Sequence, residues 1–190
     1  MSPQESLSII QSMIDKTKHS LSDGSHYFLL WGYAVFLGCA IQYSLLVIGY
    51  HKHYLAWSII LLAIIMHNVF FFRDSKRQRA VTFIEEANGK LWMGVGIAFG
   101  VMSVMFVKIG YQYCFPFYIL FYGVGSFISG NLIKFKPLII GGIICYLLAA
   151  VAVFTTYPTQ ILICAISVLV SYIIPGHMLR SQYRKQIALS

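Results

Sequence analysis

The sequence predicts an all-α, polytopic membrane protein in which six transmembrane helices form three antiparallel hairpins, preceded by an N-terminal amphipathic interfacial helix. The chain has 190 residues, of which 58% are hydrophobic and 11% are charged. Its mean hydropathy of +0.74 is too high for an ordinary soluble domain. The apolar residues are gathered in continuous runs of about 20, the length of helix that crosses a bilayer core about 30 Å thick. These runs lack the alternation of lipid-facing and lumen-facing residues that a membrane β-barrel requires.

The first predicted element is a surface helix within a cytoplasmic segment at residues 1–26. Ser2 followed by Glu5 is a capping-box pattern, which marks a helix N-terminus. Apolar residues then recur at helical spacing over residues 2–21, namely Leu7, Ile10, Ile14 and Leu21. This apolar stripe is too narrow for a span. We therefore expect the segment either to lie on the membrane surface or to dock a protein partner.

Six spans are expected to follow, and together they make a transmembrane domain at residues 27–179. The predicted spans are 27–49, 54–72, 91–109, 115–133, 137–156 and 158–179. Pro116, Pro137 and Pro158 each stand in the first turn of a span, where the missing amide donor is tolerated. Most links are so short that successive helices must be antiparallel neighbours. A basic tail at residues 180–190 follows the last span and is expected to be cytoplasmic.

The distribution of cations predicts the orientation of the bundle. Twelve Lys and Arg residues fall on one predicted side: Lys16, Lys18, Arg73, Lys76, Arg77, Arg79, Lys90, Lys134, Lys136, Arg180, Arg184 and Lys185. Only Lys52 and Lys108 fall on the other. Because Lys and Arg near span ends stay in the cytoplasm, we predict that both termini are cytoplasmic. The net charge of +8 then favours membrane lipids with anionic headgroups, and not nucleic acid, as partners. Trp31, Trp57 and Trp92 lie near predicted span ends, which is typical of interfacial anchors.

Ionisable side chains are scarce inside the predicted spans. All six Asp and Glu residues fall in predicted cytoplasmic segments. Proton relays and acid–base hydrolysis usually need a buried carboxylate, so a proton-coupled carrier and an intramembrane protease are disfavoured. The four cysteines have no short-spaced partner, and only Cys114, at a span end, is expected to be accessible. We therefore predict no catalytic residue, no metal site and no cofactor, and we expect that the protein is not an enzyme.

Four polar side chains form the candidate site that the sequence suggests. Asn68, Asn131 and His177 stand near the cytoplasmic ends of the second, fourth and sixth spans, and His67 precedes Asn68. An amide or imidazole in or near hydrocarbon seeks hydrogen-bond partners, so we expect these groups to converge in a polar cluster. A packing role and a functional role both remain open for it.

Small residues are frequent in the third and fourth spans. Gly96 and Gly100 form a G-x-x-x-G pattern, while Ser126, Ser129 and Gly130 give the fourth span a small, slightly polar face. Such faces allow close helix contact, within the bundle or between two copies in a homo-oligomer. The face of the fourth span could instead line a path for a small solute.

Three stretches of the sequence resemble a known group of proteins. They are YFLLWG at 27–32, GNLIKFKPLIIGG at 130–142 and SYIIPGHMLR at 171–180. Each is similar to a segment of a family of small multi-pass bacterial inner-membrane proteins with no assigned activity. The resemblance implies a location in the bacterial inner membrane, and it implies no catalytic or binding residue.

These observations predict a class of function. We expect a non-enzymatic regulatory, sensory or assembly module that acts through its cytoplasmic face, by way of the N-terminal helix and the basic loop after the second span. The alternative is a small-solute or ion facilitator or channel, in which the fourth span lines the path. A membrane enzyme ranks third, because no nucleophile has a base within reach by sequence.

Overall fold

The computed structural model describes residues 24–75 and 83–187, and all regular structure within these residues is helical. Six of the helical segments are long and apolar enough to cross a membrane. They are Ser25–Val47, His53–Asp74, Phe83–Ile109, Tyr111–Leu132, Lys136–Val153 and Tyr157–Gln182. The predicted all-α fold with six candidate spans is therefore confirmed. The predicted surface helix at 2–21 lies outside the described residues.

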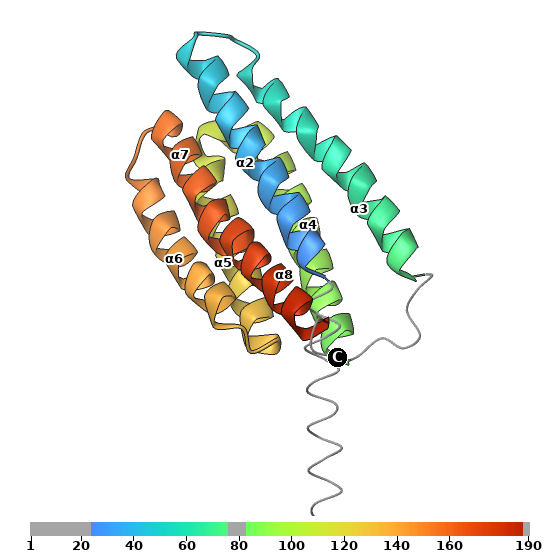
Figure 1. Cartoon of the computed structure of the whole chain (residues 1–190). Helices are drawn as coiled ribbons and strands as arrows, with labels where there is room; N and C mark the ends of the chain where they lie inside the picture. Colours follow the sequence, from blue (N-terminus) through green and yellow to red (C-terminus); the bar gives the residue numbers. More distant parts are fainter. Residues whose placement is uncertain (1–23, 76–82, 188–190) are drawn as a thin grey trace, which may run out of the picture.

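Apart from residues 76–82, which lie outside the described chain, the helices follow one another with short connections (Figure 1). Their bounds are α2 Ser25–Val47, η1 His53–Ser58, α3 Ile59–Ser75, α4 Phe83–Ile109, η2 Tyr111–Tyr113, α5 Cys114–Leu132, α6 Lys136–Val153, α7 Tyr157–Val168, η3 Leu169–Ile173 and α8 Ile174–Ile187. The η1 and η2 segments are 3₁₀ turns, whereas η3 is a π-helical segment that joins α7 to α8 in one continuous span.

The predicted span boundaries agree with the helices to within a few residues at most ends, and the two large differences have one cause. α4 begins at Phe83 and not at 91, and the last span continues as α8 to Ile187. Polar residues extend both helices beyond their apolar parts. In α4, Glu85 and Glu86 lie in the first turn, where a negative charge interacts favourably with the helix dipole. Lys90, one turn later, forms an ion pair with Glu86 at 2.6 Å.

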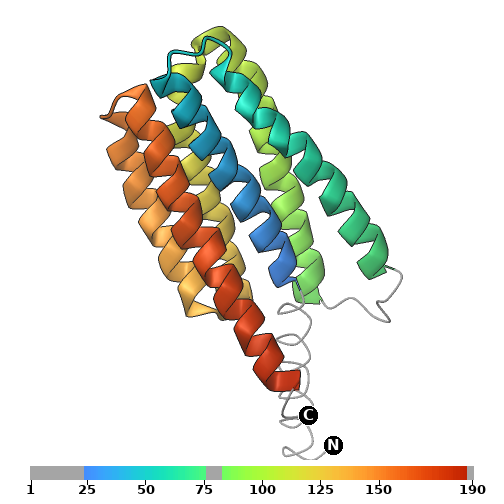
Figure 2. The ribbon, with the colours of Figure 1, turned by 45° about the horizontal axis from the view of Figure 1, so that its top comes forward.

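The six spans alternate in direction, so α2, α4 and α6 begin at the end of the bundle where α3, α5 and α8 finish (Figures 1 and 2). We call this the basic end. It carries most cations of the described residues, namely Arg73, Lys90, Lys134, Lys136, Arg180, Arg184 and Lys185. Lys52 and Lys108 lie at the opposite end. The uneven distribution of cations thus follows the helix order, and the side that faces the cytoplasm stays a prediction.

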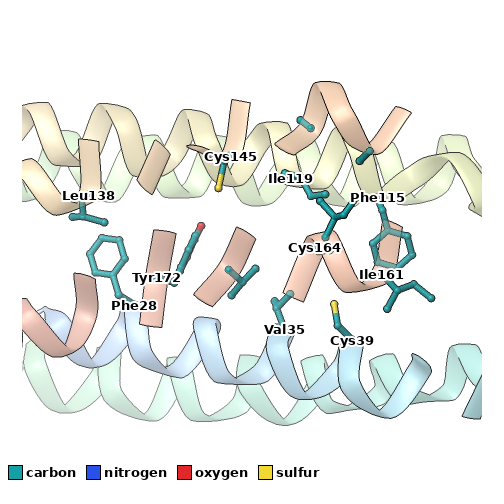
Figure 3. Close-up of a cluster of buried hydrophobic side chains, with 14 of the residues drawn as sticks. Phe28, Val35, Cys39, Phe115, Ile119, Leu138, Cys145, Ile161, Cys164 and Tyr172 are labelled. Carbon is teal, nitrogen blue, oxygen red and sulfur yellow. The ribbon is translucent and has the colours of Figure 1, made fainter. Parts of the chain in front are cut away.

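The core lies among α2, α5, α6 and the continuous α7–η3–α8 span. Figure 3 shows Val35 of α2, Ile119 of α5, Cys145 of α6 and Cys164 of α7 in the space enclosed by these helices, and each is buried. The most extensive contact between two helices is that of α5 with α6. α3 packs chiefly on α2 and η1, and α4 chiefly on α5. Both are therefore peripheral helices, and the predicted grouping into three hairpins stays a prediction.

Glycine permits the closest contacts between the core helices. A Cβ on Gly142 of α6 would lie 2.7 Å from the backbone nitrogen of Phe127 in α5. One on Gly141 would lie 2.8 Å from the carbonyl oxygen of Val170 in η3. Small residues at such positions let helix backbones approach, which is a main source of helix association in lipid.

The π-helical segment is explained by the proline that follows it. Pro175 has no amide hydrogen, so it cannot satisfy the carbonyl one turn earlier, at Ser171. The Ile174 amide bonds to Leu169 O, five residues back, so this hydrogen bond spans one residue more than in an α-helix. The Ser126 hydroxyl of α5 lies 3.4 Å from Ser171 O and donates to it. A neighbouring helix thus supplies a donor to the freed carbonyl.

Candidate functional site

Polar and aromatic side chains join α2 to α3 at the basic end of the bundle. This basic-end cluster consists of His26, Tyr27 and Trp31 from α2, with His67 and Asp74 from α3. The Tyr27 hydroxyl donates to Asp74 Oδ2 at 2.8 Å, and His26 Nε2 lies 3.1 Å from the same oxygen. The Trp31 indole N–H donates to His67 Nδ1 at 3.2 Å.

Helix periodicity brings these residues together. Tyr27 and Trp31 are four residues apart, and His67 and Asp74 are seven apart, so each pair lies on one face of its helix. α2 and α3 run in opposite directions, so the first turn of α2 meets the last turn of α3. The cluster therefore closes the basic end of this helix pair.

Ring contacts fix the two imidazoles of the cluster. The His67 ring centroid lies 5.0 Å from that of Tyr27 and 5.9 Å from that of Trp31. The His26 ring contacts Phe70 edge-on, with a centroid separation of 5.3 Å. Aromatic pairs at such distances contribute about 0.5–1.5 kcal/mol beyond the area that they bury. Both imidazoles are thus held in place by neighbouring rings.

The chemistry of the cluster is that of a shared carboxylate at a partly open site. The side chains of His26 and Asp74 are 34% and 33% exposed. Asp74 accepts a hydrogen bond from Tyr27, and its Oδ2 also lies within hydrogen-bond distance of His26 Nε2. The α2–α3 contact at this end therefore depends on the Asp74 carboxylate. Within residues 24–75 and 83–187, no three His, Cys, Asp or Glu side chains are grouped so that they could hold a metal ion.

The polar cluster predicted from the sequence is not formed by the two asparagines. The Asn68 amide donates to the carbonyl of Ile64, one turn earlier on α3, and its side chain is exposed. The Asn131 amide likewise donates to Phe127 O on α5, at 2.8 Å, and is exposed. Each amide donates to its own helix and is exposed, so neither side chain is directed toward a partner across the bundle.

The two histidines of the predicted cluster have separate partners on α2. His177 of α8 lies 2.8 Å from the Tyr33 hydroxyl, and His67 of α3 accepts from Trp31. α3 packs mainly on α2 and η1, which keeps its polar residues away from α5. The peripheral position of α3 is therefore the reason why the four side chains do not form the single polar cluster that the sequence predicts.

A second polar network lies at the opposite end and is centred on a buried amide with half-buried partners. Gln42 of α2 is 1% exposed and makes three hydrogen-bond contacts. Its amide nitrogen donates to the Tyr157 hydroxyl at 2.9 Å and lies 3.3 Å from His53 Nδ1. Its carbonyl oxygen accepts from the Trp57 indole at 2.8 Å. This single amide thus connects α2 to η1 and α7, as buried polar groups in membrane bundles commonly do.

The three tryptophans, which the sequence predicts as interfacial anchors, donate hydrogen bonds between helical segments of the bundle. Trp31 donates to His67 and Trp57 donates to Gln42, as described above. Trp92 of α4 donates to the buried Ser129 hydroxyl of α5 at 3.0 Å. Its ring fills the space beside Gly125, where a Cβ would come within 2.4 Å. Each indole thus joins two helical segments.

Sequence reasoning missed most of the basic-end cluster because Asp74 was assigned to the loop after the second span. α3 continues to Ser75, so Asp74 lies on the same helical face as His67. The spacing of His67, Phe70 and Asp74, three and then four residues, was the available signal. His26 and Tyr27 at the start of the first span carried no such signal without knowledge of which helices meet.

Comparison with known proteins gives no match to this chain among protein-family models, curated proteins or solved structures. The resemblance to small bacterial inner-membrane proteins therefore stays a prediction. Function has to be argued from the geometry of the chain itself.

Proposed function

We propose that this protein is a non-enzymatic integral membrane module that acts as a regulatory, sensory or assembly partner through its basic end. The proposal places that end in the cytoplasm and the protein in the bacterial inner membrane. The observation that carries it is the basic-end cluster, in which one carboxylate, Asp74, is shared by His26 and Tyr27 at a partly exposed site. A charge-dependent contact at a membrane surface suits the recognition of a partner or a change in local charge.

The position of α3 gives the cluster a mechanical consequence. α3 has its main contacts with α2 and η1, and most of its side chains face outward. Its last turn is held by the hydrogen bonds to Asp74. Loss of the negative charge on Asp74 weakens those bonds, and a cation from a partner competes for the same carboxylate. Either change releases the end of α3. The segment that follows α3 in the sequence is strongly basic. A change in how α3 packs on α2 would therefore change the position of positive charge at the membrane surface.

The alternative proposal, a small-solute or ion facilitator, has less support from the packing. It requires a path along the small face of α5. The side chains of Ser126 and Ser129 on that face are 0% exposed. A Cβ on Gly123 would lie 2.9 Å from the Tyr146 ring of α6. The face is thus occupied by close helix contacts.

Site-specific photo-crosslinking in cells tests the proposal. A photoreactive amino acid is placed at exposed positions of the basic end, Lys136 and Gln182, and at exposed positions of the opposite end, Tyr50 and Tyr111. We expect one defined protein adduct from the basic end, and a weaker adduct when Asp74→Asn is added.

Two results would count against the module. One is a protein adduct from the opposite end alone. The other is solute flux, in liposomes that contain only the purified protein, which would favour the facilitator. The matched control is Tyr54→Phe, which changes an exposed tyrosine at the opposite end and is expected to leave the adduct unchanged.

A further inference from the structure

A cavity of about 400 Å³ lies between the final turns of α4 and the start of α5, at the opposite end of the bundle. Its lining consists of Met102, Met105, Phe106, Ile109, Tyr113 and Phe117. Ligand pockets in proteins begin at roughly this volume. The cavity shares no residue with the basic-end cluster, so what it binds is independent of the function proposed above.

The local sequence explains why the two helices leave this space. Phe106 is buried between α4 and α5, and its ring centroid lies 5.6 Å from that of Phe117 and 6.2 Å from that of Tyr118. These rings hold the two helices apart. Gly110, with a φ of 115°, then reverses the chain. The turn η2 brings Tyr113 over the end of the cavity.

The lining restricts the chemistry of what can enter. It presents no polar surface, so a water molecule inside would lack hydrogen-bond partners. Both walls belong to candidate membrane spans, and the surrounding medium is therefore hydrocarbon. Two of the lining side chains are methionines, whose flexible thioethers adapt to irregular apolar shapes. An acyl chain meets all of these conditions.

A charged residue at the same end of the bundle as the cavity indicates the headgroup. Lys108 is exposed and stands one residue before Ile109 of the lining in the sequence, on the last turn of α4. No Asp or Glu occurs in the sequence after Glu86, and the acidic residues of the described chain, Asp74, Glu85 and Glu86, lie at the basic end. Within residues 24–75 and 83–187, Lys108 therefore has no acidic side chain at its own end of the bundle. A lipid phosphate is the complementary anion in a membrane.

We propose that this cavity binds one acyl chain of an anionic phospholipid whose phosphate is held by Lys108. The site recognises two parts of the lipid. The apolar cavity binds the acyl chain, and the Lys108 ammonium group selects a negatively charged headgroup.

Photolabelling in vesicles tests the site. The full-length protein is reconstituted in phosphatidylcholine containing phosphatidylglycerol, with a trace of phosphatidylglycerol that carries a diazirine in the part of one acyl chain nearest the headgroup. Adducts are located by mass spectrometry after digestion. We expect adducts to be concentrated on Met102, Met105 and Phe117. We also expect unlabelled phosphatidylglycerol to compete for this site and unlabelled phosphatidylcholine to compete poorly.

Two pairs of variants separate the site from bulk lipid. Lys108→Gln is expected to weaken competition by phosphatidylglycerol about fivefold, the effect of one basic residue beside an anionic lipid. Lys52→Gln, the other cation at that end, should leave it unchanged. Met105→Trp fills the cavity from a half-exposed position and should remove the adducts, whereas Ile97→Trp, exposed on the same helix, should not. Adducts spread evenly over α3 and α4, or equal competition by both lipids, would overturn the proposal.

Discussion

The Tyr27 hydroxyl donates a 2.8 Å hydrogen bond to Asp74 Oδ2, and this bond ties the first turn of α2 to the last turn of α3. The same oxygen lies 3.1 Å from His26 Nε2, so one carboxylate oxygen serves two residues of α2. Few other elements hold α3, whose main contacts are with α2 and η1. The stability of this peripheral helix should therefore depend on Asp74 and its donors.

Removing the Tyr27 hydroxyl tests that dependence. We expect Tyr27→Phe to lower the free energy of unfolding by about 1 kcal/mol, because a hydrogen bond to a charged acceptor contributes about 1.5–3 kcal/mol and partial exposure reduces this value. Thermal unfolding of the purified protein in detergent measures the change. Tyr54→Phe, at an exposed tyrosine of the opposite end, is the control and should have no effect. Equal stability of wild type and Tyr27→Phe would show that the bond does not hold α3.

The neighbouring residues His67 and Asn68 show how far sequence reasoning reaches. Both were expected in one polar cluster, yet consecutive helical residues point about 100° apart. His67 faces α2 and accepts from Trp31, while Asn68 is exposed and donates to its own helix. α3 is apolar around most of its circumference, so its sequence carries no stripe that tells which face meets the bundle.

Span lengths and ends were easier to predict, for a physical reason that the prolines illustrate. The bilayer sets the length of an apolar run, and proline is accommodated without loss of a hydrogen bond in the first turn of a helix. α6 and α7 accordingly begin at Lys136 and Tyr157, each one residue before its proline. Which helices touch depends instead on side-chain shape, as at Gly142 beside Phe127, and a single sequence does not contain that pairing directly.

Glycines of two kinds provide a test of the packing. A Cβ on Gly142 would lie 2.7 Å from the Phe127 nitrogen, whereas one on Gly100 would meet no atom within 4 Å. Gly142→Ala should destabilise the protein by about 1–3 kcal/mol, the usual range for overpacking. Gly100→Ala should be neutral or should stabilise α4 by up to about 1 kcal/mol, since alanine favours helix. Both are measured by thermal unfolding. A marked loss of stability in Gly100→Ala would indicate that two copies of the chain associate through this face of α4.

The buried amide of Gln42 is expected to be essential for the opposite end. Gln42→Leu removes the partner of the Trp57 indole and of the Tyr157 hydroxyl. Leaving a buried polar group unpaired costs about 1–3 kcal/mol, so unfolding should occur at a clearly lower temperature. Gln182→Leu changes an exposed glutamine of α8 and serves as the control. If Gln42→Leu is as stable as wild type, the network contributes nothing to the fold.

Orientation can be tested with the native cysteines in place. All four are buried, including Cys114 at 5% exposure, although its position at a helix end suggested accessibility. The wild-type protein should therefore resist a membrane-impermeant maleimide in intact cells. We expect Lys52→Cys to react and Gln182→Cys to react only after the membrane is permeabilised, because we place the basic end in the cytoplasm. The reverse pattern would invert the orientation.

Lys134 adopts a backbone conformation that favours glycine, and this gives the last prediction. Its φ is 54°, in the left-handed region. The Phe135 amide donates a 2.8 Å hydrogen bond to Gly130 O, and this bond caps the end of α5. α2 ends in the same way with glycine, since Gly49 has a φ of 74° and the Tyr50 amide bonds to Leu45 O.

Replacing the lysine should therefore stabilise the α5–α6 turn. The left-handed conformation costs a non-glycine residue about 1–2 kcal/mol, and the extra freedom of glycine in the unfolded chain offsets part of this gain. We expect Lys134→Gly to raise the free energy of unfolding in detergent by about 0.5–1 kcal/mol. Lys136→Gly, two residues later in the first turn of α6, should lower it instead, because glycine weakens a helix. A loss of stability in Lys134→Gly, seen in anionic vesicles as well as in detergent, would mean that the lysine side chain contributes more to the turn than its backbone strain costs.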